Sequence, residues 1–108
     1  MSSIQETERE SAANATAPRV ALADIEAAIK EVEYSVVYDI LTLAIVIMNN
    51  GYIVVGKSAP ASPENFNAEL GRKFAYEDAV RQIWPLMGFA LRERLSIPEY
   101  ILDDPDNK

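Results

Sequence analysis

The sequence predicts an α+β fold with an N-terminal helix, a β-hairpin and a long C-terminal helix. Three observations support this prediction: an amphipathic segment at residues 20–34, the Asn50-Gly51 dipeptide between two runs of β-branched residues, and a helical pattern from Ser62 to Leu95. With 108 residues, of which 49% are hydrophobic, the chain can form one domain with a modest core. We therefore expect an oligomer in which the sheet and the helices are completed between protomers.

A single domain is predicted at residues 20–97, with a tail at each end. Residues 1–19 are polar and mixed in charge, which is typical of a flexible tail, and they lack the apolar core of a signal peptide. Residues 98–108 form an acidic tail. The longest apolar run, residues 40–48, is half of what a membrane-spanning helix needs. These features predict a soluble, intracellular protein without a membrane partner.

The first helix is predicted at residues 20–34, where apolar residues recur at spacings of three and four. Two strands follow at about 38–49 and 52–57, joined by a type I′ turn at Asn50-Gly51, since this dipeptide readily adopts two positive φ angles. The first strand is apolar on both faces, and such strands are covered on both sides. A second copy of the chain is the simplest cover.

The C-terminal helix is predicted to begin at Ser62 as N-cap, with Pro63 in the first helical position. Pro85 should kink or break it, because proline lacks the N–H and clashes with the preceding turn. The second piece then covers residues 86–95. The helix has more apolar surface than one core face needs, so it either breaks at Gly71 or also packs against a partner chain.

Residues 51–58, GYIVVGKS, match the phosphate-binding pattern G-x-x-x-x-G-K-[ST]. A phosphate loop connects a strand to a helix and leaves its backbone N–H groups free. Here the middle residues are strand formers of the hairpin, and the segment after Ser58 contains two prolines where a helix is required. The match therefore does not predict a nucleotide hydrolase.

Composition excludes several classes of function. A formal net charge of −7 argues against sequence-independent binding to the phosphate backbone of DNA. The absence of cysteine and histidine excludes Ser-His-Asp and Cys-His catalysis and most zinc sites. The acidic residues of the C-terminal tail lack the spacing of a calcium loop, and no carboxylate pair suggests acid–base chemistry. We expect no enzyme activity, no metal and no cofactor.

Basic residues concentrate at residues 72–94, and two interpretations fit them. In the first, they are a solvated charge row on a helix that mediates oligomerisation. In the second, Arg72, Lys73 and Arg81 form an anion pocket beside aromatic residues, since guanidinium groups hold phosphate and aromatic faces stack on bases. Spacing alone favours the solvated row.

The segments IMNNGYIVVGKSA and SPENFNAELGRKFAYEDAVRQIWPLMGFALRERL, together with IEAAIKEVEY before them, resemble a family of small tailed-phage proteins. The family is typified by gene product 49 of phage N4 and gene product 66 of phage Sf6, and the resemblance covers about residues 22–95. Lys57 and Pro60 depart from it, at positions where an acid and a small residue are expected. The chain is also similar to the Thoeris anti-defence proteins, phage proteins that oligomerise and sequester cyclic nucleotide immune signals.

This second resemblance implies a sponge in the host bacterial cytoplasm, which binds a cyclic ADP-ribose isomer or a cyclic oligonucleotide without cleaving it. The ligand would lie in pockets between protomers, formed by the long helix and the loop before it. The matching positions are Asn65, Phe66, Arg72, Lys73, Arg81, Trp84 and Arg92. The alternative is a homo-oligomeric phage protein that binds or inhibits a host protein and takes no small ligand.

Overall fold

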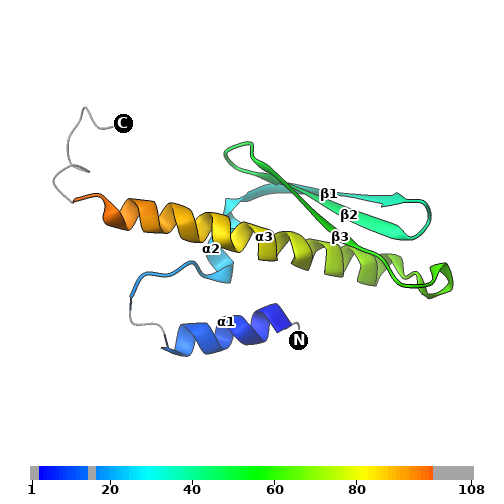
Figure 1. Cartoon of the computed structure of the whole chain (residues 1–108), viewed down its shortest axis with the longest axis horizontal. Helices are drawn as coiled ribbons and strands as arrows, with labels where there is room; N and C mark the ends of the chain where they lie inside the picture. The colour runs from blue at the N-terminus through cyan, green and yellow to red at the C-terminus, as the bar shows by residue number, and fades with distance from the viewer. Residues whose placement is uncertain (1–2, 15–16, 99–108) are drawn as a thin grey trace.

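The structure is a computed structural model that describes residues 3–14 and 17–98. It has the predicted α+β class, with a sheet and a long C-terminal helix (Figure 1). The elements in chain order are α1 (Ser3–Asn14), α2 (Leu22–Ala28), β1 (Ile29–Val37), β2 (Leu41–Met48), β3 (Ile53–Ser58), the 3-10 turn η1 (Pro63–Asn65) and α3 (Ala68–Ser96).

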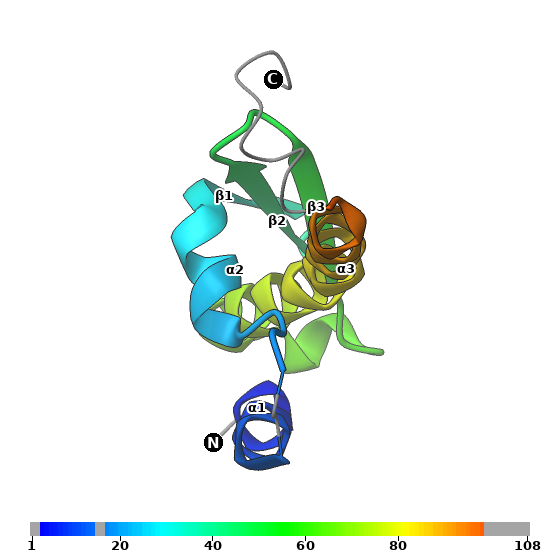
Figure 2. The same cartoon turned by 90° about the vertical axis from the view of Figure 1, so that its left-hand side faces the viewer.

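The three strands form an antiparallel sheet in the order β1-β2-β3, and α3 packs across one face of it. Figures 1 and 2 show α1 on the side of α3 away from the sheet, and the C-terminal part of α3 extending beyond the sheet. The core lies between α3, the sheet and α2, where Ile25, Val46, Val80 and Ile83 are fully buried. No described helix is both long enough and apolar enough to span a bilayer.

The helix predicted at residues 20–34 is wrong in its second half. α2 ends at Ala28, and the chain enters β1 at Ile29. From Glu31 to Val36, charged or polar residues alternate with larger residues, which is the period of a strand and not of a helix. The apolar strand β2 supplies the partner: Val32 pairs with Val46 in the ladder. β1 pairs with one edge of β2 and β3 pairs with the other. This pairing outweighs the helical pattern that the sequence shows before β2.

The hairpin at Asn50-Gly51 is confirmed, but the predicted turn type is wrong. Gly51 has a φ of 89°, whereas Asn50 is not among the described residues with positive φ. The Gly51 N–H donates to the Met48 carbonyl at 2.9 Å, and the Met48 N–H donates to the Tyr52 carbonyl at 2.8 Å. This is a three-residue connection ending in a left-handed glycine.

The turn with two positive φ angles lies instead between β1 and β2. Tyr38 and Asp39 have φ of 57° and 60°, and the Ile40 N–H donates to the Val37 carbonyl at 3.3 Å. These angles define a type I′ turn, whose twist matches that of the flanking strands. No glycine marks it, so the sequence signal for this turn was absent, and the predicted strand beginning at residue 38 begins instead at Leu41.

α3 is one continuous helix with Pro85 inside it, so of the two predicted alternatives a break at Pro85 is wrong, and a kink there stays a prediction. Pro85 is exposed, so the carbonyl that loses its helical partner faces solvent and need not be buried. The predicted N-cap, Ser62, begins only the turn η1. The N-cap of α3 is Asn67, whose side-chain oxygen accepts a hydrogen bond from the Leu70 N–H at 3.0 Å.

Residues 3–14, within the segment predicted to be a flexible tail, form α1. Ile4 is only 9% exposed and packs on the core cluster. The Arg19 guanidinium binds the Glu8 carboxylate through both of its terminal nitrogens. Apart from Pro98, the predicted acidic tail at residues 98–108 lies outside the described part of the chain.

Candidate functional site

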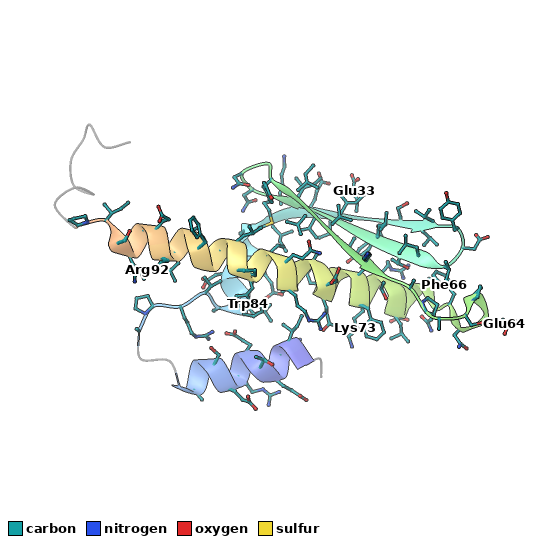
Figure 3. The ribbon with its side chains drawn as sticks, in the orientation of Figure 1. Glu33, Glu64, Phe66, Lys73, Trp84 and Arg92 are labelled. Atoms are coloured by element: carbon teal, nitrogen blue, oxygen red, sulfur yellow. The ribbon has the colours of Figure 1, made fainter. Side chains whose placement is uncertain are left out.

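The loop between β3 and α3 folds back over the first turns of α3 and encloses a cavity. Figure 3 shows Phe66 at this end of the molecule, where β3 leads into α3. The cavity has a volume of about 200 Å³. Its lining consists of Thr42, Ser58, Ala59, Pro60, Asn65, Phe66, Asn67, Leu70, Gly71 and Phe74. We call it the loop cavity.

The loop is held in shape by its own backbone hydrogen bonds. The Asn65 N–H donates to the Ser62 carbonyl at 3.0 Å, and the Phe66 N–H donates to the Pro63 carbonyl at 3.1 Å. These two bonds form η1, and Pro63 fixes φ at its start. The cap at Asn67 then turns the chain into α3. Asn65 and Phe66 are therefore placed beside the cavity by a short, ordered connection.

A buried polar atom lies at this cavity. The side chain of Thr42, on β2, is fully buried, and its hydroxyl makes no hydrogen bond within the described part of the chain. A buried hydroxyl without a partner costs about 1–3 kcal/mol. A Cβ built on Gly71 would fall 2.5 Å from the Thr42 oxygen, so only glycine leaves room for this hydroxyl under α3.

Thr42 was missed as a site residue, although the sequence held one signal for it. It is the polar residue that interrupts the apolar run of residues 40–48. Such a residue in a fully apolar strand needs a partner, because polar groups in a protein interior are nearly always hydrogen-bonded. Its proximity to the loop depends on the packing of α3 on β2, which the sequence does not reveal.

The seven predicted ligand-binding residues do not gather in one place within a single chain. Asn65 and Phe66 line the loop cavity, and Arg72 directly follows Gly71 of its lining. Arg72 and Arg81 are nine residues apart, which is two and a half turns, so they lie on opposite sides of α3. Arg92 is about 30 Å along the helix from Arg72. Figure 3 shows Arg92 near the far end of α3.

Lys73 lines a second cavity, on the side of α3 toward α1 and α2. Its lining consists of Ile4, Gln5, Leu22, Glu26, Tyr34, Lys73, Tyr76, Glu77 and Val80. Burial raises the pKa of the Tyr76 phenol, and the nearby Glu26 carboxylate and Tyr34 raise it further. Tyr76 therefore stays neutral at physiological pH and serves as a packing residue with a polar tip.

Trp84 has a structural role in this chain. Its indole Nε1 donates to the Val20 carbonyl at 3.1 Å, and its ring packs against the core cluster. This bond ties the segment before α2 to the middle of α3. The ring is therefore engaged by its own chain.

The P-loop-like segment is part of the hairpin, which confirms the interpretation from sequence. Residues 53–58 are strand β3, and the backbone N–H of Lys57 donates to the Asp78 carboxylate at 2.9 Å. Gln82 donates to the Val55 carbonyl at 2.8 Å. The backbone groups of this strand are thus engaged by α3 and by β2, and the segment cannot cradle phosphate.

Across residues 3–14 and 17–98, no group of three or more acidic side chains is placed to hold a metal ion. Glu64, Glu69 and Asp78, the acidic residues of the connection before α3 and of its first half, thus form no such group. Asp103, Asp104 and Asp106 lie outside the described residues.

Comparison with known proteins places the chain in a family. Residues 20–95 match the profile of the phage protein family described as N4 Gp49/phage Sf6 gene 66. The chain belongs to this phage protein family. The matched region runs from the segment before α2 to the last turn of α3 and includes the loop cavity. No curated protein and no solved structure matches the chain significantly.

Proposed function

We propose that this phage-family protein is a homo-oligomer that binds a cyclic nucleotide immune signal of the host and sequesters it without cleaving it. The observation that carries the proposal is the loop cavity. It joins an aromatic ring, Phe66, an amide, Asn65, and the unpartnered hydroxyl of Thr42. Aromatic rings stack on bases, and amide and hydroxyl groups bind base edges and ribose.

The size of the cavity fits one part of such a ligand. Pockets that enclose a whole drug-sized molecule have volumes of about 300–1,000 Å³. The loop cavity, at about 200 Å³, would take one base of the ligand. The rest of the ligand would lie at the mouth of the cavity beside Arg72. The phosphates would then be reached by Arg72 and by a second protomer. The positions of Arg81 and Arg92 on other parts of α3 support a site shared between protomers.

The groups lining the loop cavity favour binding over cleavage. They offer hydroxyl, amide and apolar surface, and the lining contains no carboxylate. The sequence has no histidine or cysteine, the residues that most often act as base or nucleophile. A protein that only sequesters its ligand needs neither group. We propose the host bacterial cytoplasm, where such signals are made, as the place of action.

The test is a thermal-shift screen of the purified protein against ADP-ribose isomers, cyclic di- and trinucleotides and their linear forms. A ligand that binds only the folded state raises its stability by RT ln(1 + [L]/Kd). We expect one cyclic ligand to raise the melting temperature by several degrees and to be recovered intact by mass spectrometry. A linear product would indicate an enzyme, and the absence of any shift would overturn the proposal.

Two substitutions locate the site once a ligand is found. Phe66→Ala and Arg72→Ala should each lower the affinity about tenfold or more, because each removes a stacking or charge-assisted contact. Arg94→Ala is the matched control, since Arg94 lies at the other end of the same helix. Equal effects at Arg72 and Arg94 would show that binding is not at the loop cavity.

A protein-binding function is the second candidate, and the C-terminal part of α3 favours it. Leu86, Phe89 and Leu95 are 47%, 70% and 50% exposed, a large amount of apolar surface on one helix. Exposed apolar helix surface is typical of protein interfaces. If no nucleotide shifts the melting temperature, capture of a host protein by the wild type and its loss in Phe89→Ser would support this function.

A further inference from the structure

The face of the sheet opposite α3 is apolar and has no cover in the described part of the chain. In the ladder, Ile45 pairs with Val55, and Ile47 pairs with Ile53, so their side chains lie side by side on this face. Ile53 is 56% exposed and Val55 is 45% exposed. We call this the outer sheet face. Its apolar members are Leu41, Leu43, Ile45, Ile47, Ile53 and Val55.

Charged residues border the outer sheet face along its two edge strands, and they differ in sign. β1 carries Glu31 and Glu33, which pair with Ile47 and Ile45. β3 carries Lys57, which pairs with Leu43. Figure 3 shows Glu33 on the side of the sheet away from α3. β1 also carries Lys30, beside the bulge that precedes Glu31, so the β1 edge has two glutamates and this lysine, the centre is apolar, and the β3 edge has Lys57.

We propose that two copies of the chain pack through their outer sheet faces, with β1 of each copy over β3 of the other. Two sheets packed face to face lie about 10 Å apart, with strand directions within about 30°. A two-fold axis parallel to the strands exchanges the edges, so Glu33 of one copy faces the strand that carries Lys57 of the other. This arrangement pairs opposite charges at both rims of an apolar centre.

The charges select this arrangement over the other face-to-face dimer. A two-fold axis across the strands would place β1 over β1, with glutamates near glutamates, and β3 over β3, with Lys57 near its own copy. Like charges at the rim of an interface are unfavourable and serve to exclude wrong partners. An isologous contact through the strand-parallel axis therefore fits the sequence of this face better.

The extent of the face marks it as a candidate binding surface. Three strands about 4.8 Å apart and about eight residues long present roughly 360 Å². That area is comparable to the largest apolar patch on typical monomers, which is often functional. A second copy would also explain why β2 is apolar on both faces, since one face packs on α3 and the other would pack on the partner. The inference specifies the interface of the proposed oligomer and does not depend on the ligand.

The first experiment is light scattering during gel filtration over a range of concentrations, comparing Val55→Glu with Val36→Glu. Val36 is the matched control: it is 48% exposed, but its side chain is on the opposite face of the sheet. We expect a dimer or higher assembly for the wild type and Val36→Glu, and dissociation for Val55→Glu with unchanged circular dichroism. A monomeric wild type, or equal effects of the two substitutions, would overturn the proposal.

The second experiment tests the arrangement of the strands. Lys57→Glu should raise the dissociation constant about tenfold, because it places acidic residues on both strands that face each other. Adding Glu33→Lys should restore the wild-type value. Lys57→Glu retains the backbone bond to Asp78, since that bond uses the main-chain nitrogen. The strand-crossing axis would exchange one like-charged contact for another, so a dissociation constant that Lys57→Glu leaves unchanged would indicate that axis and would overturn the proposed arrangement.

The nucleotide screen and the Val55→Glu measurement together separate the proposed function from the proposed interface. If the nucleotide screen fails and Val55→Glu still dissociates the assembly, the interface stands without the ligand. If a ligand binds a protein that is monomeric at every concentration, the interface and the sharing of the site between protomers are both wrong, and ligand binding alone stands. The thermal shift and the molecular mass are independent measurements.

Discussion

Gly56 of β3 lies directly against the backbone of α3 at Ala75. A Cβ built on Gly56 would overlap the Ala75 carbonyl oxygen and would lie 2.5 Å from the backbone nitrogen of Ala79. Both alanines are fully buried, so helix and strand touch without intervening side chains. The second glycine of the P-loop-like segment is therefore explained by helix–sheet packing, and not by phosphate binding.

Gly56→Ala should destabilise the fold strongly. The methyl group meets main-chain atoms, which cannot move aside like a side-chain tip, so we expect a loss of about 3 kcal/mol or more. Urea unfolding followed by circular dichroism measures it. Gly88→Ala is the control: a Cβ there meets nothing within 4 Å, so the higher helix propensity of alanine should stabilise the protein by about 1 kcal/mol. Similar stability of the two variants would contradict the close packing of β3 on α3.

Thr42→Val should stabilise the free protein by about 1 kcal/mol, because it removes a buried hydroxyl that has no partner among the described residues and keeps the side-chain shape. The same change should weaken ligand binding if the hydroxyl is a ligand contact. Thr42→Ser is the matched variant, since it keeps the hydroxyl and loses the methyl group. Thermal unfolding with and without ligand compares the two. A valine variant that binds as well as wild type would remove Thr42 from the site.

The sequence predicted the elements whose pattern is local and strong. The helical pattern between Ser62 and Leu95 corresponds to α3, and the Asn50-Gly51 connection is a hairpin. β1 was missed, because Ile29 and Val32 lie three residues apart and continue the helical spacing of the segment before them, although the alternation from Glu31 to Val36 fits a strand. Only pairing with β2 decides between the two, and pairing is a contact between distant residues that periodicity does not encode.

The candidate site was predictable only in part, because some of its residues come together through contacts between distant parts of the chain. Asn65 and Phe66 were selected from the sequence, but as residues of a helix capped by Ser62, whereas they lie in the connection before the N-cap Asn67. Thr42 is more than twenty residues earlier and reaches that loop only through the packing of β2 under Gly71. Of the three basic residues predicted to form one pocket, Arg72 and Arg81 lie on opposite sides of α3, because they are nine residues apart in a regular helix.

The Glu8–Arg19 ion pair should make the docking of α1 dependent on pH. The hydrogen bond from Arg19 holds the pKa of Glu8 below its ordinary value of 4.5. The contribution of the pair is therefore complete above pH 4.5 and is lost as pH falls through the lower pKa of the folded state. Hydrogen exchange of residues 3–14 should speed up below that pH in the wild type. Glu8→Gln should show fast exchange already at neutral pH.

Glu6→Gln is the control for this measurement, because Glu6 is an exposed glutamate on the same helix. It should exchange like the wild type at every pH. Faster exchange in Glu6→Gln than in Glu8→Gln would show that general helix charge, and not the contact with Arg19, holds α1 in place.

Trp84→Phe should reveal whether this ring serves the fold or the ligand. The indole N–H binds the Val20 carbonyl at 3.1 Å, so phenylalanine leaves that carbonyl without its partner and loses part of the packed ring area. We expect a destabilisation of about 1–2 kcal/mol by denaturant unfolding. Because the ring is engaged by its own chain, ligand affinity should stay within about twofold of the wild type. A large loss of affinity with unchanged stability would instead place Trp84 in the binding site.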